Sequence, residues 1–224
     1  MKAYKYRIYP NKTQEVLLAK HFGWARYIYN YGLERKIKSY SETKKSVSRF
    51  TIQADLPKMK KAEETKWLSE VNSLSLQAAL LNLDMAFTRF FKEKKGFPKF
   101  KSKHDNRQAF QVLQNTTVNY EAKRVYLPKF KEGIKCRFSR KFDGKIKTST
   151  VSKTPTGKYF ISILVETEDT LPNKAPIDEN KAVGVDLGIK TFATLSDGTE
   201  IQNPKYLNKA LKKLKRLQRS VSRK

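Results

Sequence analysis

The hydrophobic pattern of this chain changes at Gly96-Phe97-Pro98, and that change constrains the fold more than any other feature. Between about 11 and 95, apolar residues recur every three to four positions, which is typical of amphipathic helices. From there to about 168, apolar and polar residues alternate, which is typical of half-buried strands. The predicted helices cover 11–40, 50–65 with an interruption near Pro57, and 74–93. The predicted strands cover 2–9, 108–114, 117–120, 124–127, 133–138, 146–153 and 158–167. The expected fold class is therefore α+β, with the short strands in a small barrel or sandwich.

A second boundary comes after the last of these strands. Residues 166–180, ETEDTLPNKAPIDEN, are rich in carboxylates and show no apolar periodicity, which predicts a linker over 169–181. Beyond it, 182–185 is a short apolar strand that leads to Asp186. Strands 191–195 and 200–202 are joined by the hairpin signal Ser196-Asp197-Gly198. Residues 205–224 are a basic amphipathic helix whose pattern stops without a C-terminal cap, which favours a fragment of a longer chain.

The charge of the chain indicates the kind of partner it binds. There are 48 Lys and Arg against 21 Asp and Glu, so the formal net charge is +27. A folded protein with this charge repels itself unless a polyanion neutralises it, and nucleic acid is the usual polyanion. Apolar residues make up 38% of the chain and aromatic residues 12%, which is too much for a disordered basic tail. Composition alone leaves open whether the partner is DNA or RNA.

The sequence excludes several other classes of protein. Cys136 is the single cysteine, which excludes a disulfide framework, and with only His21 and His104 beside it no Cys/His zinc site is expected. No apolar run approaches the roughly 20 residues of a membrane span. The N-terminus also lacks the apolar segment of a signal peptide. We therefore expect a soluble cytoplasmic protein with no membrane partner, and the sequence leaves its oligomeric state open.

The segment Val183-Gly184-Val185-Asp186-Leu187-Gly188-Ile189-Lys190 is the strongest candidate for chemistry. It places one carboxylate, Asp186, in an apolar strand, and Gly184 and Gly188 permit close approach of other backbone or of a ligand. A carboxylate held in this way is the hard oxygen ligand that Mg²⁺ prefers. The alternative is an Asp that caps a turn or accepts backbone hydrogen bonds. Asp197 and Glu200, nearby, are interpreted as a turn former and a solvated edge residue.

Basic residues interleaved with aromatic ones form a second candidate, Phe97-Pro98-Lys99-Phe100-Lys101-Ser102-Lys103-His104. Lys99, Lys101 and Lys103 are predicted to contact phosphates. Phe97 is predicted to lie in the core where the helices meet the strands. Backbone contacts are also expected from the C-terminal basic helix, through Lys212, Lys213 and Arg216.

Four blocks together resemble the TnpB family, the transposon-encoded RNA-guided endonucleases related to type V CRISPR effectors. The blocks are KAYKYRIYPN, KAEETKWLSEVNSLSLQ, GFPKFKSK and VGVDLGIKTFATLSDG, and they occur in family order along the whole chain. The resemblance implies a wedge-type β-barrel from 1–10 plus 96–168, with a helical, helix-turn-helix-like recognition lobe inserted at 11–95. It implies that 182–224 is the start of an RNase H-like RuvC domain, in which Asp186 is the first catalytic Asp. The implied partners are a guide RNA and a target DNA, in the nucleoid of a prokaryote.

The resemblance also implies which residues read DNA. In the family, the helix that matches 74–93 and the polar stretch before it read a short motif next to the transposon. Gln77 stands where a family Gln has this role, and Ser73 falls where the family can place a Lys. Arg49 falls in the other reading segment by ungapped alignment. The alternative for all three residues is ordinary helix surface.

The chain departs from its family beyond Asp186. A RuvC site needs a Glu and a second Asp from later strands, and the family carries two CxxC pairs that hold zinc, but these 224 residues contain neither. The implied Mg²⁺ site is therefore incomplete, and we expect the chain to be inactive as a nuclease. Two alternatives are a truncated remnant that only binds RNA and DNA, and a structural RNA-binding protein.

Overall fold

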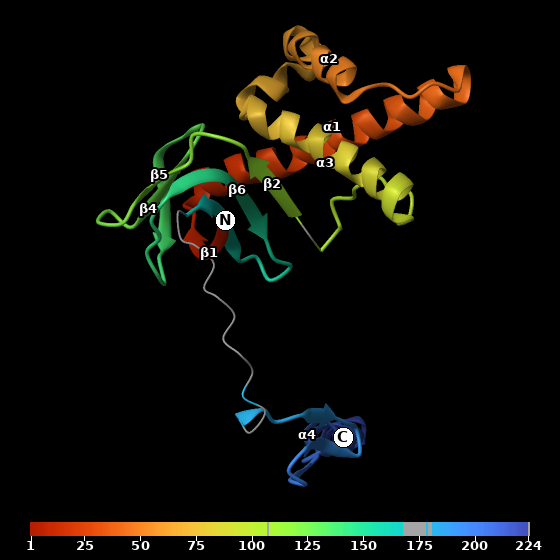
Figure 1. Ribbon diagram of the computed structural model, residues 1–224, viewed down its shortest axis with the longest axis vertical. Helices are drawn as coiled ribbons and strands as arrows, with labels where there is room; N and C mark the ends of the chain where they lie inside the picture. Colours follow the sequence, from red (N-terminus) through yellow and green to blue (C-terminus); the bar gives the residue numbers. More distant parts are fainter. Residues whose placement is uncertain (107, 168–177, 179–180, 224) are drawn as a thin grey trace. The chain divides into compact units, whose positions relative to one another are not determined.

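The computed structural model describes residues 1–224 except 107, 168–177, 179–180 and 224, and the chain divides into two units, Met1–Asp169 and Thr170–Lys224 (Figure 1). Most of the linker predicted over 169–181 lies outside the described residues. The expected combination of helices with an antiparallel sheet is confirmed. None of the helices described combines the length and apolar character that crossing a membrane requires.

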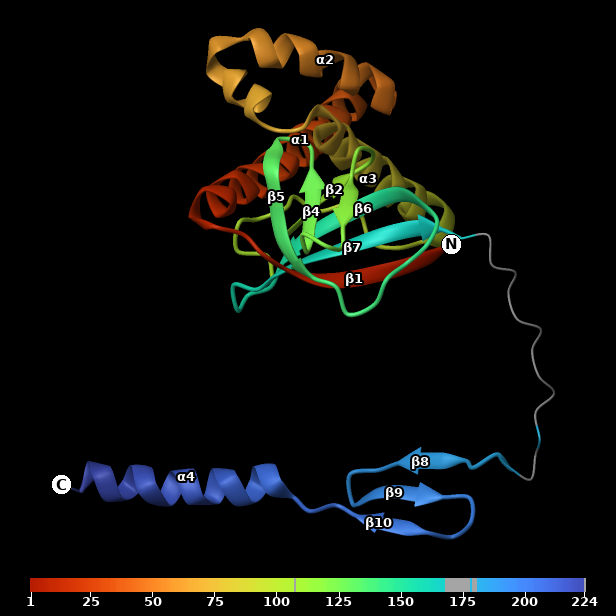
Figure 2. The same cartoon turned by 90° about the vertical axis from the view of Figure 1, so that its left-hand side faces the viewer.

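Three helices and a 3₁₀ segment form the helical part of the first unit. They are α1 (Lys12–Thr43), α2 (Arg49–Lys61), η1 (Glu63–Glu70) and α3 (Ser73–Glu93). A capping box fixes the start of α1, because the Asn11 side chain accepts from the Gln14 N–H and the Gln14 side chain accepts from the Asn11 N–H. α1 packs closely on α3 at Gly32, where an added Cβ would lie 2.8 Å from Leu80 Cδ2. Figures 1 and 2 both show these helices gathered on one side of the sheet, with α2 furthest from it.

The predicted interruption at Pro57 is wrong, because α2 runs through Pro57 and ends at Lys61. A proline inside a helix removes one backbone hydrogen bond and costs about 3 kcal/mol. Two residues of α2, Ile52 and Leu56, are buried, and burying such a side chain contributes roughly 1.5–3 kcal/mol. Tertiary packing therefore offsets the local cost of the proline.

The first unit also contains a seven-stranded antiparallel sheet, in the order β2-β6-β7-β1-β5-β4-β3. The strands are β1 (Lys2–Tyr9), β2 (Gln108–Val112), β3 (Thr117–Asn119), β4 (Arg124–Leu127), β5 (Phe130–Arg137), β6 (Lys145–Lys153) and β7 (Tyr159–Glu166). β1 lies at the centre and pairs with β7 on one side and β5 on the other. Figure 2 shows β4 and β5 upright while β1 and β7 run across, so the sheet curls. Its order ends at β2 and β3, which are not paired with each other in the described residues.

His21 joins the helices to the sheet from a fully buried position. Its ring packs 4.9 Å from the Phe110 ring and 5.4 Å from the Phe130 ring. The Asn72 N–H, at the start of α3, donates to His21 Nε2 (3.3 Å). Nε2 must therefore carry a lone pair, which places the proton of the neutral ring on Nδ1, where it is donated to the Leu17 carbonyl (2.8 Å). Burial lowers the pKa of His21 to about 4.

This depressed pKa predicts a loss of stability in acid. Above pH 6.5 His21 is neutral in both states and its contribution is fully present. As the pH falls, the unfolded chain takes up a proton that the folded chain accepts only near pH 4, so stability is lost between those values. The full loss is about 3 kcal/mol. Urea denaturation at pH 7 and pH 4 measures it, with His21→Gln as the non-titrating comparison. Equal losses in the two proteins would contradict the prediction.

The second unit consists of a three-stranded sheet and a helix. The strands β8 (Val185–Leu187), β9 (Thr191–Leu195) and β10 (Glu200–Gln202) are antiparallel, in the order β10-β9-β8, and α4 is Tyr206–Ser222. The first strand begins later than the predicted residue 182, and Asp186 is its central residue, as the surrounding motif indicates. Ala193 is the only buried residue among those described in this unit.

Candidate nucleic-acid interface

The start of α3 brings two of the predicted DNA-reading residues together. The Asn72 side chain caps the helix by accepting from the Leu74 N–H (3.3 Å). Ser73 is exposed and Gln77 is half-buried; four residues apart, they lie one above the other on one face of the helix. None of the described hydrogen bonds uses the Gln77 amide, so both of its hydrogen-bonding ends are available to a ligand.

Lys60, which sequence reasoning missed, lies beside this face. Its ammonium donates to the Ser73 hydroxyl. Burial, with a smaller contribution from Lys129, lowers the pKa of Lys60. An ammonium group close to a helix N-terminus, where backbone N–H groups are also free to donate, favours an anion such as a phosphate. Lys60 and Lys129 are 69 residues apart in the sequence, so no local pattern could have paired them.

Arg49 is placed apart from Ser73 and Gln77. It is the first residue of α2, whereas Lys60, which contacts Ser73, is eleven residues further along that helix, about 16 Å away at 1.5 Å per residue. The Arg49 guanidinium lies 4.4 Å from the centre of the Phe50 ring, and Phe50 is exposed. Arg49 therefore belongs to a separate cation–aromatic pair at the other end of α2.

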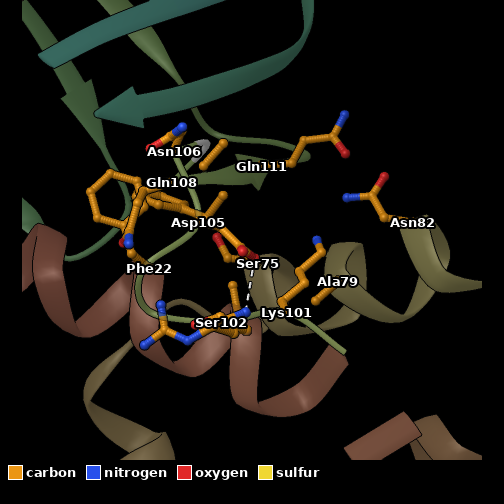
Figure 3. Close-up of a pocket in the computed structure, with 14 residues that line it drawn as sticks. Phe22, Ser75, Ala79, Asn82, Lys101, Ser102, Asp105, Asn106, Gln108 and Gln111 are labelled. Carbon is orange, nitrogen blue, oxygen red and sulfur yellow. Dashed lines mark hydrogen bonds between the residues drawn. The ribbon is translucent and has the colours of Figure 1, made fainter. Parts of the chain in front are cut away.

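A pocket of about 510 Å³, lined by both apolar and polar side chains, lies between α1, α3 and β2 (Figure 3). Asn82 of α3 and Gln111 of β2 lie at the same end of it in Figure 3. Side-chain amides of this kind can donate and accept at once, as base edges require. This pocket lies on the opposite face of α3 from Gln77, because its α3 residues, Ser75, Ala79 and Asn82, follow a helical stripe about 140° to 160° away.

The segment with Lys99, Lys101 and Lys103 is held against α1 by Asn30. The Asn30 side chain accepts from the Lys101 N–H (2.8 Å) and donates to the Lys101 carbonyl (3.0 Å). Lys99, Lys101 and Lys103 are all exposed, as phosphate contacts require. The Lys101 ammonium also lies 4.0 Å from the centre of the Tyr29 ring, and desolvation of this ammonium lowers its pKa. Lys101 is thus a ring contact within the protein as well as part of the pocket wall.

The prediction that Phe97 lies in the core is wrong. Phe97 is 46% exposed. Its ring packs edge-on against Phe87 and Phe90 near the end of α3. The buried residue at the junction is Pro98, so the chain turns from helix to sheet over a proline and leaves the aromatic ring outside.

Asp186 lies on the polar face of the second unit's sheet. Asp186 pairs with Thr194, and Thr194 pairs with Glu200, so these three side chains share one face. Neighbouring strands are about 4.8 Å apart, which separates the Asp186 and Glu200 backbones by about 10 Å. Val185 and Leu187, which alternate with Asp186, lie on the other face with Ala193. The sheet thus presents exposed carboxylates on one side and apolar residues on the other.

The two motif glycines have different local roles. At Gly188 an added Cβ would lie 2.8 Å from the Thr191 carbonyl oxygen, so close approach of backbone requires glycine there. At Gly184 the nearest atom would be Ser196 Cβ at an ordinary 3.5 Å. The Gly184 N–H donates to Ser196 Oγ (3.0 Å), which fastens the start of the motif to the hairpin. Asp197 accepts from the Thr199 N–H (2.9 Å), which also lowers its pKa.

α4 separates apolar from basic side chains completely. Its apolar stripe, Leu207, Leu211, Leu214, Leu217 and Val221, is exposed throughout. At 100° per residue, Lys212 and Arg216 fall on the opposite face and Lys213 at its margin. A continuous basic face on a straight helix is suited to contact with a phosphate backbone.

Comparison with known proteins defines the class of protein to which this chain belongs. Residues 1–45 match the family model described as "Helix-turn-helix domain", and residues 162–224 match the one described as "Probable transposase", both of the IS605 OrfB type. Within 1–45 the structure contains β1 and the single continuous helix α1. The class is thus that of the IS605 OrfB transposases.

Relatives identify the family within this class. The chain is 36% identical over 225 residues to a Streptomyces pristinaespiralis protein called "Putative RNA-guided DNA endonuclease", covering 100% of this chain and 55% of that protein. It is 34% identical over 224 residues to the Escherichia coli K12 protein "Putative RNA-guided DNA endonuclease InsQ", covering 100% of this chain and 54% of that protein. The chain belongs to the TnpB family.

The chain spans about half the length of these curated relatives. Among solved structures it is similar to a chain in a Cas12f1–sgRNA–target DNA complex, at 13% identity and a TM-score of 0.38, covering 97% of this chain and 60% of that one.

Proposed function

We propose that this chain is the portion of an RNA-guided DNA endonuclease that binds the guide RNA and recognises DNA. In this proposal the sheet of the first unit is a wedge-type barrel, the helices are the recognition lobe, and the second unit begins the RuvC domain. The observation that supports it most is the alignment with both curated relatives over the whole chain. A net charge of +27 fits a partner that is itself a polyanion.

The described residues do not by themselves fit a two-metal centre. Mg²⁺ requires near-octahedral oxygen coordination, and two-metal cleavage needs several carboxylates around ions roughly 4 Å apart. Asp186 is the one carboxylate on β8, and Glu200 lies two strands away. No group of three His, Cys, Asp or Glu side chains able to hold a metal ion is found in the described part of the chain. We propose Asp186 as one Mg²⁺ ligand, with the other ligands outside these 224 residues.

A non-catalytic binder of RNA and DNA is the second candidate function, and the isolated position of Asp186 favours it. Both candidates require the same nucleic-acid surfaces and differ only in whether a complete metal site exists. Binding measurements therefore test what the two share. A cleavage assay of these 224 residues does not separate them, because neither candidate has a complete metal site within the described residues.

Recognition of a DNA motif is tested most directly at Gln77. A Gln side chain can pair with adenine through two hydrogen bonds in the major groove, and losing such a pair costs roughly 1–3 kcal/mol. Gln77→Ala should therefore weaken binding to the preferred DNA motif by about 5- to 150-fold and change binding to scrambled DNA little.

Lys103→Ala is the matched comparison, since Lys103 is exposed and predicted to contact phosphate only. It should weaken binding to both DNAs alike. Competition binding on a randomised DNA library selects the preferred motif first, and titrations with both variants are then carried out. Equal losses on motif and scrambled DNA for Gln77→Ala would show that Gln77 is only helix surface.

A further inference from the structure

A groove of about 830 Å³ runs between the C-terminal halves of α1 and α3, away from the surfaces described above. Five aromatic rings line it: Tyr40, Phe87, Phe90, Phe91 and Phe97. Tyr40 is 60% exposed and Phe91 73% exposed. A concave surface on which several aromatic rings are exposed is more often a binding site than an ordinary part of a protein surface. We call this surface the aromatic groove.

The rings of the aromatic groove support one another and leave faces open. Phe97 packs edge-on against Phe87 (5.5 Å between ring centres, 90° between planes) and against Phe90 (5.3 Å, 85°). Phe91 is held by an offset stack on Phe87 (6.2 Å, 23°) and by edge contact with Phe90. The result is a fixed platform whose outermost ring, Phe91, is still mostly open to a flat partner.

The charges around the groove favour an anionic occupant. Lys36, Lys44 and Lys92 line it, and Asp84 is its single carboxylate. Asp84 already pairs with Lys36 (3.4 Å). Lys44 and Lys92 form no ion pair within the part of the chain that the structure describes. An apolar peptide or a second copy of this chain would cover these two ammonium groups without pairing them, which is costly; phosphates would pair them.

Hydroxyl groups in the groove can accept a hydrogen bond from a ribose. Ser41 Oγ donates to the Lys38 carbonyl (2.8 Å) and Thr88 Oγ1 donates to the Asp84 carbonyl (3.0 Å). Because the hydrogen of each hydroxyl is already donated to a carbonyl, the two oxygens can only accept a further hydrogen bond. A ribose 2′-hydroxyl is a donor that DNA lacks. Aromatic rings that stack splayed bases, together with contacts to the 2′-hydroxyl, are the usual means of recognising single-stranded RNA.

We propose that the aromatic groove binds unpaired bases of RNA, with one base stacked on Phe91 and the flanking phosphates on Lys44 and Lys92. This rests on the proposed binding of RNA and gives it a site. It is separate from the proposed reading of duplex DNA, because Phe91 lies fourteen residues after Gln77, about 21 Å further along α3. The two proposals can therefore fail separately.

The test is a fluorescence-anisotropy titration with a short labelled RNA that has no self-complementarity. Stacking of one base on an aromatic side chain is worth about 1–3 kcal/mol, so Phe91→Ala should weaken RNA binding roughly 5- to 150-fold. Phe91→Trp keeps a ring and should bind at least as tightly as the original chain. Met85→Ala is the control, because Met85 is an exposed residue of the same helix outside the groove.

Three results would overturn the proposal. Unchanged RNA affinity in Phe91→Ala would show that no base stacks there. Equal affinity for the same sequence as single-stranded DNA would remove the preference for RNA. Sedimentation that shows a dimer in the original chain and a monomer in Phe91→Ala would make the groove an interface between copies. These three results do not depend on whether Gln77→Ala loses recognition of the DNA motif or keeps it.

Discussion

Raising the salt concentration from 50 to 200 mM should weaken RNA binding by this chain several hundred-fold. Each phosphate contact contributes about −0.7 to the slope of log affinity against log salt for single strands and about −0.9 for duplex. With about six contacts, a fourfold rise in salt lowers the affinity by roughly 300-fold for single-stranded RNA and roughly 2,000-fold for duplex. Anisotropy titrations at several salt concentrations give the slope. A slope shallower than about −3 would contradict an interface dominated by phosphate contacts.

Variants with equal net charge test whether the basic face of α4 carries part of this effect. Changing Lys212, Lys213 and Arg216 to Gln should make the slope shallower by about 2 to 3, because each contact removed counts separately. The matched control changes three lysines that each pair with a nearby carboxylate, namely Lys38, Lys66 and Lys181. The control loses the same charge and should keep nearly the original slope. Identical slopes in the two triple variants would assign the effect to net charge alone.

The second expected result is that the 224-residue chain does not cleave DNA, although it contains Asp186. The chain is incubated with its guide RNA, a matched target and Mg²⁺ or Mn²⁺. Phosphodiester hydrolysis by a two-metal site needs the attacking water and the leaving oxygen stabilised together, and the single carboxylate of Asp186 supplies at most two oxygen ligands, too few to hold two ions. An isolated carboxylate binds Mg²⁺ weakly because the ion keeps most of its waters.

The variant Asp186→Ala shows whether any DNA cleavage that is observed depends on Asp186. Cleavage that disappears in this variant would refute the prediction and would mean that a second chain provides the missing ligands. RNA binding should stay unchanged in Asp186→Ala, since the side chain is exposed and carries the same sign of charge as phosphate. A loss of binding in the variant would instead place Asp186 in the RNA interface.

Most helices and strands could be predicted from the sequence because their period is a local property. Residues 74–93 and α3 agree to within one residue, and the strand predicted over 124–127 coincides with β4. The extent of α2 could not be predicted, because the burial of Ile52 and Leu56 depends on how α2 packs against its neighbouring helices. The same reason applies to His21, which looks like an ordinary polar residue in sequence and is buried against Phe110 and Phe130.

The candidate site was less predictable than the fold. Whether a lysine contacts phosphate depends on what else its ammonium can reach, and Lys101 reaches the Tyr29 ring 72 residues earlier in the sequence. The neighbouring Lys99 and Lys103 show the same local pattern and are free of such a ring contact in the described structure. Likewise Phe97 has the sequence context of a core residue, but its exposure is set by the end of α3 against which it packs.

The central position of β1 in the sheet has a consequence for how the chain is made. β1 leaves the ribosome before the other strands of its sheet, and its partner β7 ends at Glu166. At roughly 5–20 residues per second, β1 waits on the order of 10–30 s for that partner to be synthesised. Unpaired strands aggregate unless charged residues protect them, and Lys5 and Arg7 alternate with the apolar residues of β1. These two cations therefore keep the nascent strand soluble while it has no partner.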